Sequence, residues 1–343
     1  MVRESIKFPL ALLLLLILMT GCQKGRNGQL PASTGQPYEV VVEGDTDSIV
    51  TQILTADVPG LPQPEPLCNV INVKRGQLKG SYLMVRTRIV VEIDPRNKEF
   101  SAKSSKDVNA SPQLVIRIKA KSAEQLRAML YNKAASKEGE PSQDEEASKN
   151  AQLLRNLIDQ SELQHLASLI KQNPEKQKEV KRMFGLNMKI PASLDASKKA
   201  KNFLWLSNNA STGMQNLLIF KASNSEKKAS NNEQKARNSE QIDSILKRNM
   251  VGETDNMYMI IPQLRERGLW EMKGDAMGGP YVMKRKGNIV VIAFVYAPEM
   301  KKRNLTKQLE AVLSTIRQMD FDEKSTLTTN GLADPSPSCR QQL

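Results

Sequence analysis

The residues with the widest catalytic repertoire are scarce in this sequence of 343 residues. It contains one histidine, His165, set between leucines in a helical pattern. A lone histidine in such a helix is typically a surface or packing residue, and no HExxH or other paired-histidine spacing supports a metal site. No glycine-rich phosphate loop of the form GxxxxGK(S/T) or GxGxxG occurs either. The sequence therefore predicts no catalytic residue, no metal and no cofactor.

Carboxylate chemistry stays open, because two acids can meet from any distance along a chain, as they do in glycoside hydrolysis. Clefts that process glycans are usually rich in aromatic side chains. Here aromatic residues make up 4% of the sequence, and the two tryptophans are Trp205 and Trp270. Composition thus disfavours a carboxylate-dependent hydrolase without excluding it.

The densest unusual segment runs from Gly268 to Tyr281, GLWEMKGDAMGGPY. One interpretation is a binding loop with exposed backbone amides, an acid and two aromatic side chains. The other is a tight connection between strands, with its aromatics in the core and its glycines and proline shaping the backbone. We favour the structural interpretation. If it is a binding loop, the candidate residues are Trp270, Asp275, Gly278, Gly279, Pro280 and Tyr281.

The N-terminus predicts export and lipidation. A short basic opening precedes an apolar run from Leu10 that is too short to span a membrane and ends in Met19-Thr20-Gly21-Cys22. Small residues before a cysteine resemble the bacterial lipobox, although Met19 replaces the usual leucine. We expect cleavage before Cys22 and a mature chain that begins with Cys22 carrying acyl groups such as palmitate.

The chain is strongly basic, with a formal net charge of +13 that falls to +12 once residues 1–21, with a net charge of +1, are removed. In an exported protein, anionic lipid head groups are the natural counter-surface, and nucleic acid is not expected. No run of basic residues exceeds three, the length of Lys301-Lys302-Arg303. For that reason we favour dispersed, solubilising charge. Cys68 is expected to be buried, and a disulfide between Cys68 and Cys339 is left open.

Strand and helix patterns occur in groups without a regular βαβ alternation, which predicts an α+β fold with mainly antiparallel sheets. Two strand-like runs, 280–285 and 289–296, predict a hairpin turned near Gly287-Asn288, whose second arm, Ile289–Tyr296, is apolar on both faces. Residues 222–238 are almost entirely Ser, Asn, Lys, Glu, Gln and Ala, from which no core can be built, so they predict a flexible insertion. The expected organisation is a signal peptide (1–21), a lipidated tether (22–36), two α+β domains (37–178 and 179–320) and a disordered tail (321–343).

Several segments together resemble a known family. These are the lipobox, LPASTGQPYEVVV, PQPEPLCNV, GLWEMKGDAMGGPYV and FVYAPEMKKRNLTKQLEAVLSTI. In order, and over nearly the whole chain, they resemble an uncharacterised lipoprotein family of Bacteroidota, domain of unknown function 4837. The resemblance implies an envelope location and no established activity or catalytic residue. Surface-exported lipoproteins of that phylum carry acidic residues after the lipidated cysteine, whereas Gln23-Lys24-Gly25-Arg26 follows here. That favours an anchor facing the periplasm, in the outer rather than the inner membrane.

The resulting hypothesis is a lipid-anchored, non-enzymatic envelope protein that acts as a binding or assembly component. Its partners would be the membrane, through the N-terminal lipid, and other envelope proteins or anionic head groups. Two alternatives remain: a carboxylate-dependent hydrolase acting on envelope glycan or peptide, and a purely structural lipoprotein.

Overall fold

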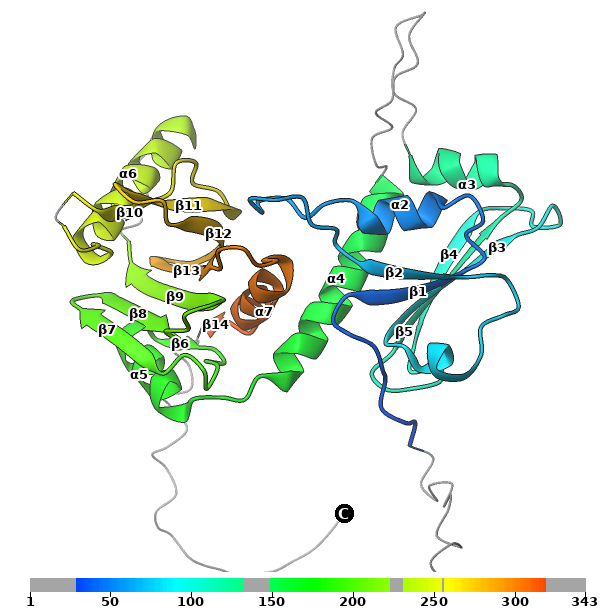
Figure 1. The fold of residues 1–343 in the computed structure, drawn as a ribbon, viewed down its shortest axis with the longest axis horizontal. Helices are drawn as coiled ribbons and strands as arrows, with labels where there is room; N and C mark the ends of the chain where they lie inside the picture. The colour runs from blue at the N-terminus through cyan, green and yellow to red at the C-terminus, as the bar shows by residue number, and fades with distance from the viewer. Residues whose placement is uncertain (1–28, 132–148, 223–230, 255, 319–343) are drawn as a thin grey trace, which may run out of the picture. The chain divides into compact units, whose positions relative to one another are not determined.

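The computed structural model describes residues 29–131, 149–222, 231–254 and 256–318. They form two compact units (Figure 1). The first comprises the described residues up to Thr55 together with Cys68–Ile158, and the second comprises Ala56–Leu67 together with the residues from Asp159 onward. The predicted signal peptide, Cys22, the tail after Asp320 and Cys339 lie outside the described residues. The predicted domain boundary between residues 178 and 179 falls inside a helix of the second unit and stays a prediction.

The first unit is built on a five-stranded sheet with the order β2-β1-β3-β5-β4. Strands β1, β2, β3 and β5 run parallel, and the edge strand β4 is antiparallel to β5. Helix α4 begins in this unit and continues into the second. The elements are β1 (Glu39–Glu43), α2 (Ile49–Thr55), β2 (Asn69–Val73), the 3₁₀ helix η1 (Gly80–Met84), β3 (Thr87–Ile93), β4 (Ser101–Lys106), β5 (Leu114–Ala120), α3 (Ala123–Leu130) and α4 (Lys149–Leu169).

The second unit is built on a seven-stranded antiparallel sheet with the order β10-β11-β12-β13-β9-β8-β7. A separate two-stranded sheet pairs β6 with β14. The elements are α5 (Pro174–Phe184), β6 (Leu186–Asn187), β7 (Ala196–Ala200), β8 (Phe203–Ser207), β9 (Met214–Lys221), α6 (Asn231–Asn249), β10 (Tyr258–Ile260), β11 (Arg267–Lys273), β12 (Gly278–Lys286), β13 (Ile289–Tyr296), α7 (Arg303–Ser314) and β14 (Arg317–Gln318).

Helices cover both faces of this larger sheet. Helices α5 and α7 pack on one face with Val180, Leu309 and Val312, while α6 packs on the other with Ile242 and Leu246. Strand β13 lies between the two layers, so its alternate side chains enter the two cores in turn. Its first seven residues are buried, which confirms the predicted two-sided apolar strand. The predicted hairpin is also confirmed, with Gly287 at a φ of 56° in the turn between β12 and β13.

The α+β class is confirmed, with two differences in detail. Antiparallel pairing dominates the second unit, whereas the first sheet is mostly parallel, because helix α2 and the chain after it return β2 alongside β1 in the same direction. Helix α6 begins at Asn231, so residues 231–238 of the expected flexible insertion are helical, and residues 223–230 lie outside the described residues. Within the described part, no helix is long and apolar enough to cross a bilayer.

Candidate functional site

The glycine-rich segment becomes strand β11, a turn and strand β12. Trp270 and Tyr281 are 2% and 1% exposed, so both aromatic side chains belong to the core under α6. The Trp270 indole donates a hydrogen bond from Nε1 to the Val295 carbonyl at 3.1 Å. The Tyr281 hydroxyl accepts from the Arg265 N–H at 2.9 Å and lies 3.1 Å from the Gln263 and Arg265 carbonyls. Burial raises the pKa of the Tyr281 phenol.

The two candidate glycines of this segment lie where neighbouring backbones come close. Gly279 pairs with Trp270 across β11 and β12, and a Cβ on Gly279 would lie 2.1 Å from the Val295 carbonyl oxygen. Close approach of backbones therefore requires this glycine, since its φ is not in the left-handed region. Gly278 has less restricted space, and a Cβ there would lie 3.0 Å from the Trp270 carbonyl oxygen.

The remaining two candidates of this segment differ in burial. Pro280 is buried opposite Leu269, whereas Asp275 is exposed in the turn, where its N–H donates to the Met272 carbonyl at 3.1 Å. The structure thus does not gather the six candidate residues around one opening. Their geometry favours the structural interpretation, because the two aromatic side chains are enclosed by protein.

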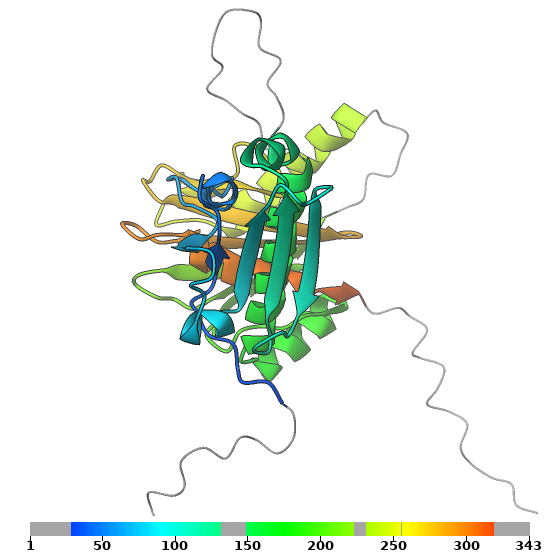
Figure 2. The same cartoon turned by 90° about the vertical axis from the view of Figure 1, so that its right-hand side faces the viewer.

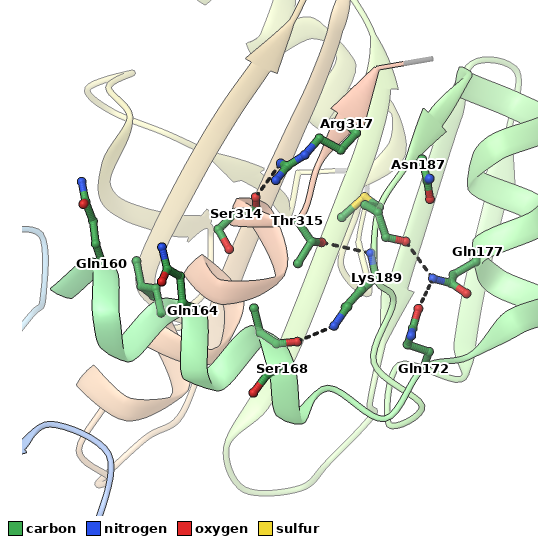
Figure 3. A pocket seen from close by; sticks show the side chains of 13 residues that line it. Gln160, Gln164, Ser168, Gln172, Gln177, Asn187, Lys189, Ser314, Thr315 and Arg317 are labelled. Atoms are coloured by element: carbon green, nitrogen blue, oxygen red, sulfur yellow. Dashed lines mark hydrogen bonds between the residues drawn. The ribbon is translucent and has the colours of Figure 1, made fainter. Parts of the chain in front are cut away.

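A cavity of about 670 Å³ lies elsewhere in the second unit (Figure 3). It is formed by the C-terminal half of α4, by α5, by the segment after β6, and by the end of α7 with β14. Its lining contains five amide side chains, three hydroxyls and two cations, but no carboxylate and no aromatic ring. The thirteen lining residues are Gln160, Leu163, Gln164, Ala167, Ser168, Gln172, Gln177, Asn187, Met188, Lys189, Ser314, Thr315 and Arg317.

Two helices end at this cavity, and their last carbonyl groups carry partial negative charge. Near the end of α4, the Ala167 carbonyl accepts from Lys189 Nζ at 2.8 Å. At the end of α7, the Ser314 carbonyl accepts from an Arg317 terminal nitrogen at 3.1 Å. Both cations of the lining therefore donate to carbonyl groups at helix C-termini.

Hydrogen bonds fix part of the lining and leave its rim exposed. Gln177 Nε2 donates to Gln172 Oε1 at 2.6 Å and to the Met188 carbonyl at 3.1 Å. The Lys189 N–H donates to Thr315 Oγ1 at 3.0 Å. Three further amide side chains, those of Gln160, Gln164 and Asn187, are exposed at the rim (Figure 3). The rim can therefore offer amide donors and acceptors to a polar ligand.

Sequence reasoning did not predict the charged cluster on α7. Lys307 is 2% exposed, and its Nζ lies 2.7 Å from Asp159 Oδ1 and 2.9 Å from Glu310 Oε2. The other oxygen of Glu310 lies 3.3 Å from a terminal nitrogen of Arg267 on β11. A buried ammonium group held by two carboxylates and a guanidinium beside them make a compensated cluster of charges.

The first turn of α7 is held by a carboxylate from a distant part of the chain. Glu65 accepts from the backbone N–H of Lys302 at 2.7 Å and of Arg303 at 3.0 Å, while Arg303 donates to the Pro66 carbonyl at 2.7 Å. Lys302 and Arg303 are each 6% exposed. The expectation that the run Lys301-Lys302-Arg303 is dispersed surface charge is therefore wrong for these two residues, because a helix N-terminus attracts the buried carboxylate.

His165 and Cys68, the other two residues with reactive side chains, do not belong to the cavity. His165 is partly buried on α4 and is not among the lining residues of the cavity. Cys68 is fully buried, as predicted. Among the residues that the structure describes, no group of three or more His, Cys, Asp or Glu side chains is placed to hold a metal ion.

Two families match the chain, and both are domains of unknown function. Residues 173–315 match domain of unknown function 4837, which confirms the resemblance for this region and covers the cavity residues from α5 to Thr315. Residues 33–137 match a second family, domain of unknown function 8532, which the sequence analysis did not separate from the first. Two separate regions of the chain are thus similar to two different domains of unknown function.

A comparison with solved structures finds a protein from Bacteroides thetaiotaomicron VPI-5482, determined at 1.50 Å resolution. The TM-score is 0.24 and the sequence identity is 18%, over 41% of this chain. This chain spans 47% of the length of that protein. No curated protein matches the sequence significantly.

Proposed function

We propose that this protein is a lipid-anchored envelope component, facing the periplasm from the outer membrane, that binds a neutral polar ligand without transforming it. The observation that carries the binding role is the amide-rich lining of the cavity between α4, α5 and α7. Amide and hydroxyl groups donate and accept hydrogen bonds at once, which suits sugar hydroxyls or peptide groups.

The same lining supports a non-enzymatic role. A hydrolase needs a group that can exchange a proton with the substrate, and in a carboxylate-dependent enzyme a pair of acids supplies it. The cavity lining contains no carboxylate, and Lys189 and Arg317 donate to backbone carbonyls. Binding by hydrogen bonds is the chemistry that these side chains can perform.

The hydrolase alternative needs a pair of acids near a substrate. Asp159 and Glu310 do approach each other, but both hold Lys307 Nζ, and Glu310 is 8% exposed. Carboxylates that share a buried ammonium partner are poor candidates for an acid and base pair, because their oxygens already contact that partner and not a substrate. The cluster therefore supports a structural role for these acids.

A photo-crosslinking experiment in intact cells tests the binding role. A photoreactive amino acid replaces Gln164 on the cavity rim, and in a matched control it replaces Lys178, which is exposed on α5 outside the lining. We expect a defined crosslinked product from position 164 and none of that product from position 178. Identical products from both positions, or none from position 164 and from a second rim position, Gln160, would contradict a ligand at this cavity.

The anchoring part of the proposal rests on the lipobox-like sequence before Cys22. Cys22→Ala removes the thiol that would be acylated, so the protein is expected to leave the membrane fraction or to keep its leader. Cell fractionation and mass spectrometry of the N-terminal peptide measure both outcomes. A Cys22→Ala protein that stays in the membrane at mature size would disprove the anchor while leaving the cavity test unaffected.

A further inference from the structure

One face of the first-unit sheet carries cations from three neighbouring strands. Lys103 on β4 lies directly opposite Arg117 on β5, and Lys119 follows two residues later on β5. Arg88 on β3 pairs with Val115, two residues before Arg117, so it shares this face. We call these four residues, Arg88, Lys103, Arg117 and Lys119, the basic sheet face.

The alternate residues of the same strands are buried on the opposite side. Ile89 and Val91 of β3 and Ile116 and Ile118 of β5 are at most 2% exposed. The basic sheet face is the outer one, and Figure 2 shows the middle of β3, β5 and β4 with no helix in front of them. Lys103, Arg117 and Lys119 are exposed there, where a partner can reach them, whereas Arg88 is buried beside them.

Ion pairing inside the molecule leaves the positive charge in excess. Glu92 lies 3.0 Å from Lys119 Nζ and 3.6 Å from a terminal nitrogen of Arg117, and these two side chains are still 47% and 50% exposed. Lys103 is exposed, and no carboxylate among the described residues lies within ion-pair distance of it. Like charges directly opposite each other, such as Lys103 and Arg117, destabilise a sheet. The fold thus keeps an unfavourable arrangement that a bound anionic partner would relieve.

Arg88 adds a second, independent observation. Its side chain is 3% exposed, and its terminal nitrogen donates to Asn109 Oδ1 at 3.1 Å. Its Nε has no hydrogen-bond partner in the described part of the chain. Burial lowers the pKa of Arg88 and the nearby Arg117 lowers it further, whereas Glu43, buried on the same face, raises it. A buried guanidinium group beside another cation is stabilised when negative charge is brought to this face.

Protection of a sheet edge does not explain the whole arrangement. Lysines on edge strands prevent pairing with other chains, and this accounts for Lys103 on the edge strand β4. Arg117 and Lys119 lie on β5, which is hydrogen-bonded on both sides. Edge protection therefore does not account for these two cations, whose partner inside the molecule is the single carboxylate of Glu92.

We propose that the basic sheet face docks on the anionic headgroup layer of a membrane. Cations spread over neighbouring strands match a layer of dispersed negative charge better than one compact ligand. Each basic residue near such a surface contributes about 1 kcal/mol, so the three exposed cations together strengthen association roughly a hundredfold. The docking goes beyond the proposed lipid anchor, and its test does not depend on that anchor.

Lysine labelling of the full-length protein in nanodiscs tests the docking. The discs contain phosphatidylcholine alone or with phosphatidylglycerol, and a water-soluble acylating reagent modifies exposed lysines. We expect phosphatidylglycerol to slow the labelling of Lys103 and Lys119 about fivefold or more, and not that of Lys178 on α5. Salt at about 1 M should abolish the protection, because it shortens the Debye length to about 3 Å.

Matched charge variants separate the face from overall charge. Arg117→Gln removes one cation from the basic sheet face and should restore labelling of Lys103 on anionic discs. Arg182→Gln removes one exposed cation from α5 and should not. Equal labelling in both lipid compositions, or equal protection of Lys178, would overturn the proposal. Protection of Lys103 and Lys119 from labelling in intact cells but not on anionic discs would also overturn the proposal and would indicate a macromolecular partner instead. Association with discs of pure phosphatidylcholine reports the lipid anchor separately.

Discussion

The β11–β12 segment and the charged side of α7 are both in the second unit, yet their sequences and their structures give opposite impressions. The segment from Gly268 to Tyr281 has the composition of a binding loop, but its aromatic side chains are enclosed and hydrogen-bonded to backbone carbonyls. The start of α7 has the composition of a solvated surface, but Lys302, Arg303 and Lys307 are buried.

The difference arises from the partner that each segment meets. The β11–β12 segment pairs with neighbouring strands, so its aromatic residues become core. Helix α7 meets Glu65, which precedes it by more than 230 residues, and Asp159 on α4. Residue type alone does not reveal whether a charge is solvated, because the compensating charge can come from anywhere in the chain. The comparison assigns packing to the first region and charge compensation to the second.

The largest expected effect is that of Gly279→Ala on the first region. The added Cβ would lie 2.1 Å from the Val295 carbonyl oxygen, so β12 or β13 must move. We expect a loss of about 4 kcal/mol or more in the free energy of unfolding. Urea unfolding followed by tryptophan fluorescence measures it, because Trp205 and Trp270 both belong to the second unit.

Gly287→Ala is the matched control for that substitution. Gly287 has a φ of 56° in the β12–β13 turn, and no atom lies within 4 Å of an added Cβ. Only backbone strain remains, which costs about 1–2 kcal/mol. An equal loss of unfolding free energy from the two substitutions would show that close packing of the strands does not explain the need for glycine at position 279.

Lys307→Met tests the second region. It removes the ammonium group between Asp159 and Glu310 and leaves the buried carboxylate of Glu310 and the partly buried one of Asp159 without it. Breaking a buried ion pair by removing one partner costs about 3–5 kcal/mol, and we expect a loss near the lower figure because Arg267 still contacts Glu310. The same fluorescence-detected urea unfolding measures the change.

A combined replacement sharpens this result. Lys307→Met with Asp159→Leu and Glu310→Leu removes all three charges while keeping apolar volume, and it should recover most of the stability lost by Lys307→Met alone. Recovery is expected if the cluster only compensates its own charges. A triple variant as unstable as the single one would show that the individual charges hold other groups in place.

The sequence predicted the β12–β13 hairpin of the second-unit sheet, because its signals are local. A continuous apolar run identified β13, and Gly287-Asn288 marked the turn before it. The mostly parallel first sheet was not predicted, since parallel pairing depends on where a crossover returns the chain, and β1 and β2 carry no local mark of it. Residues 231–238 were expected to be flexible because they are almost entirely polar, yet they extend α6 toward its N-terminus.

The candidate site was harder to predict than the fold. The cavity is lined by residues from four separate stretches of chain, and amides such as Gln164 and Asn187 carry no motif. Only the spacing of Lys307 and Glu310, three residues apart on a helix, was a local sign of an ion pair. Glu65 could not have been placed at α7 without the structure, because its contact is set by the path of the whole chain.

Tyr281→Phe returns to the first region with a smaller effect. The Tyr281 phenol oxygen accepts from the Arg265 N–H and lies near two carbonyls. Removing it leaves partly buried groups without that partner, which we expect to cost about 1–2 kcal/mol. Tyr258→Phe is the control, because the Tyr258 hydroxyl contacts an exposed Lys273 and should cost less than about 0.5 kcal/mol. Equal effects of the two substitutions would contradict the structural role of the Tyr281 hydroxyl.

Asp275→Ala has the smallest expected effect on stability, and it tests whether the turn between β11 and β12 contacts a partner. Asp275 is exposed in the turn between β11 and β12, and its backbone N–H bond to Met272 survives the substitution. The free energy of unfolding should change by less than about 0.5 kcal/mol. If the β11–β12 segment only packs, cells that carry Asp275→Ala should grow like wild type and retain the crosslinked product at position 164. A stable Asp275→Ala protein that fails to complement a deletion strain would show that this turn contacts a partner. The comparison would then change, because the first region would combine a packed core with an exposed recognition turn.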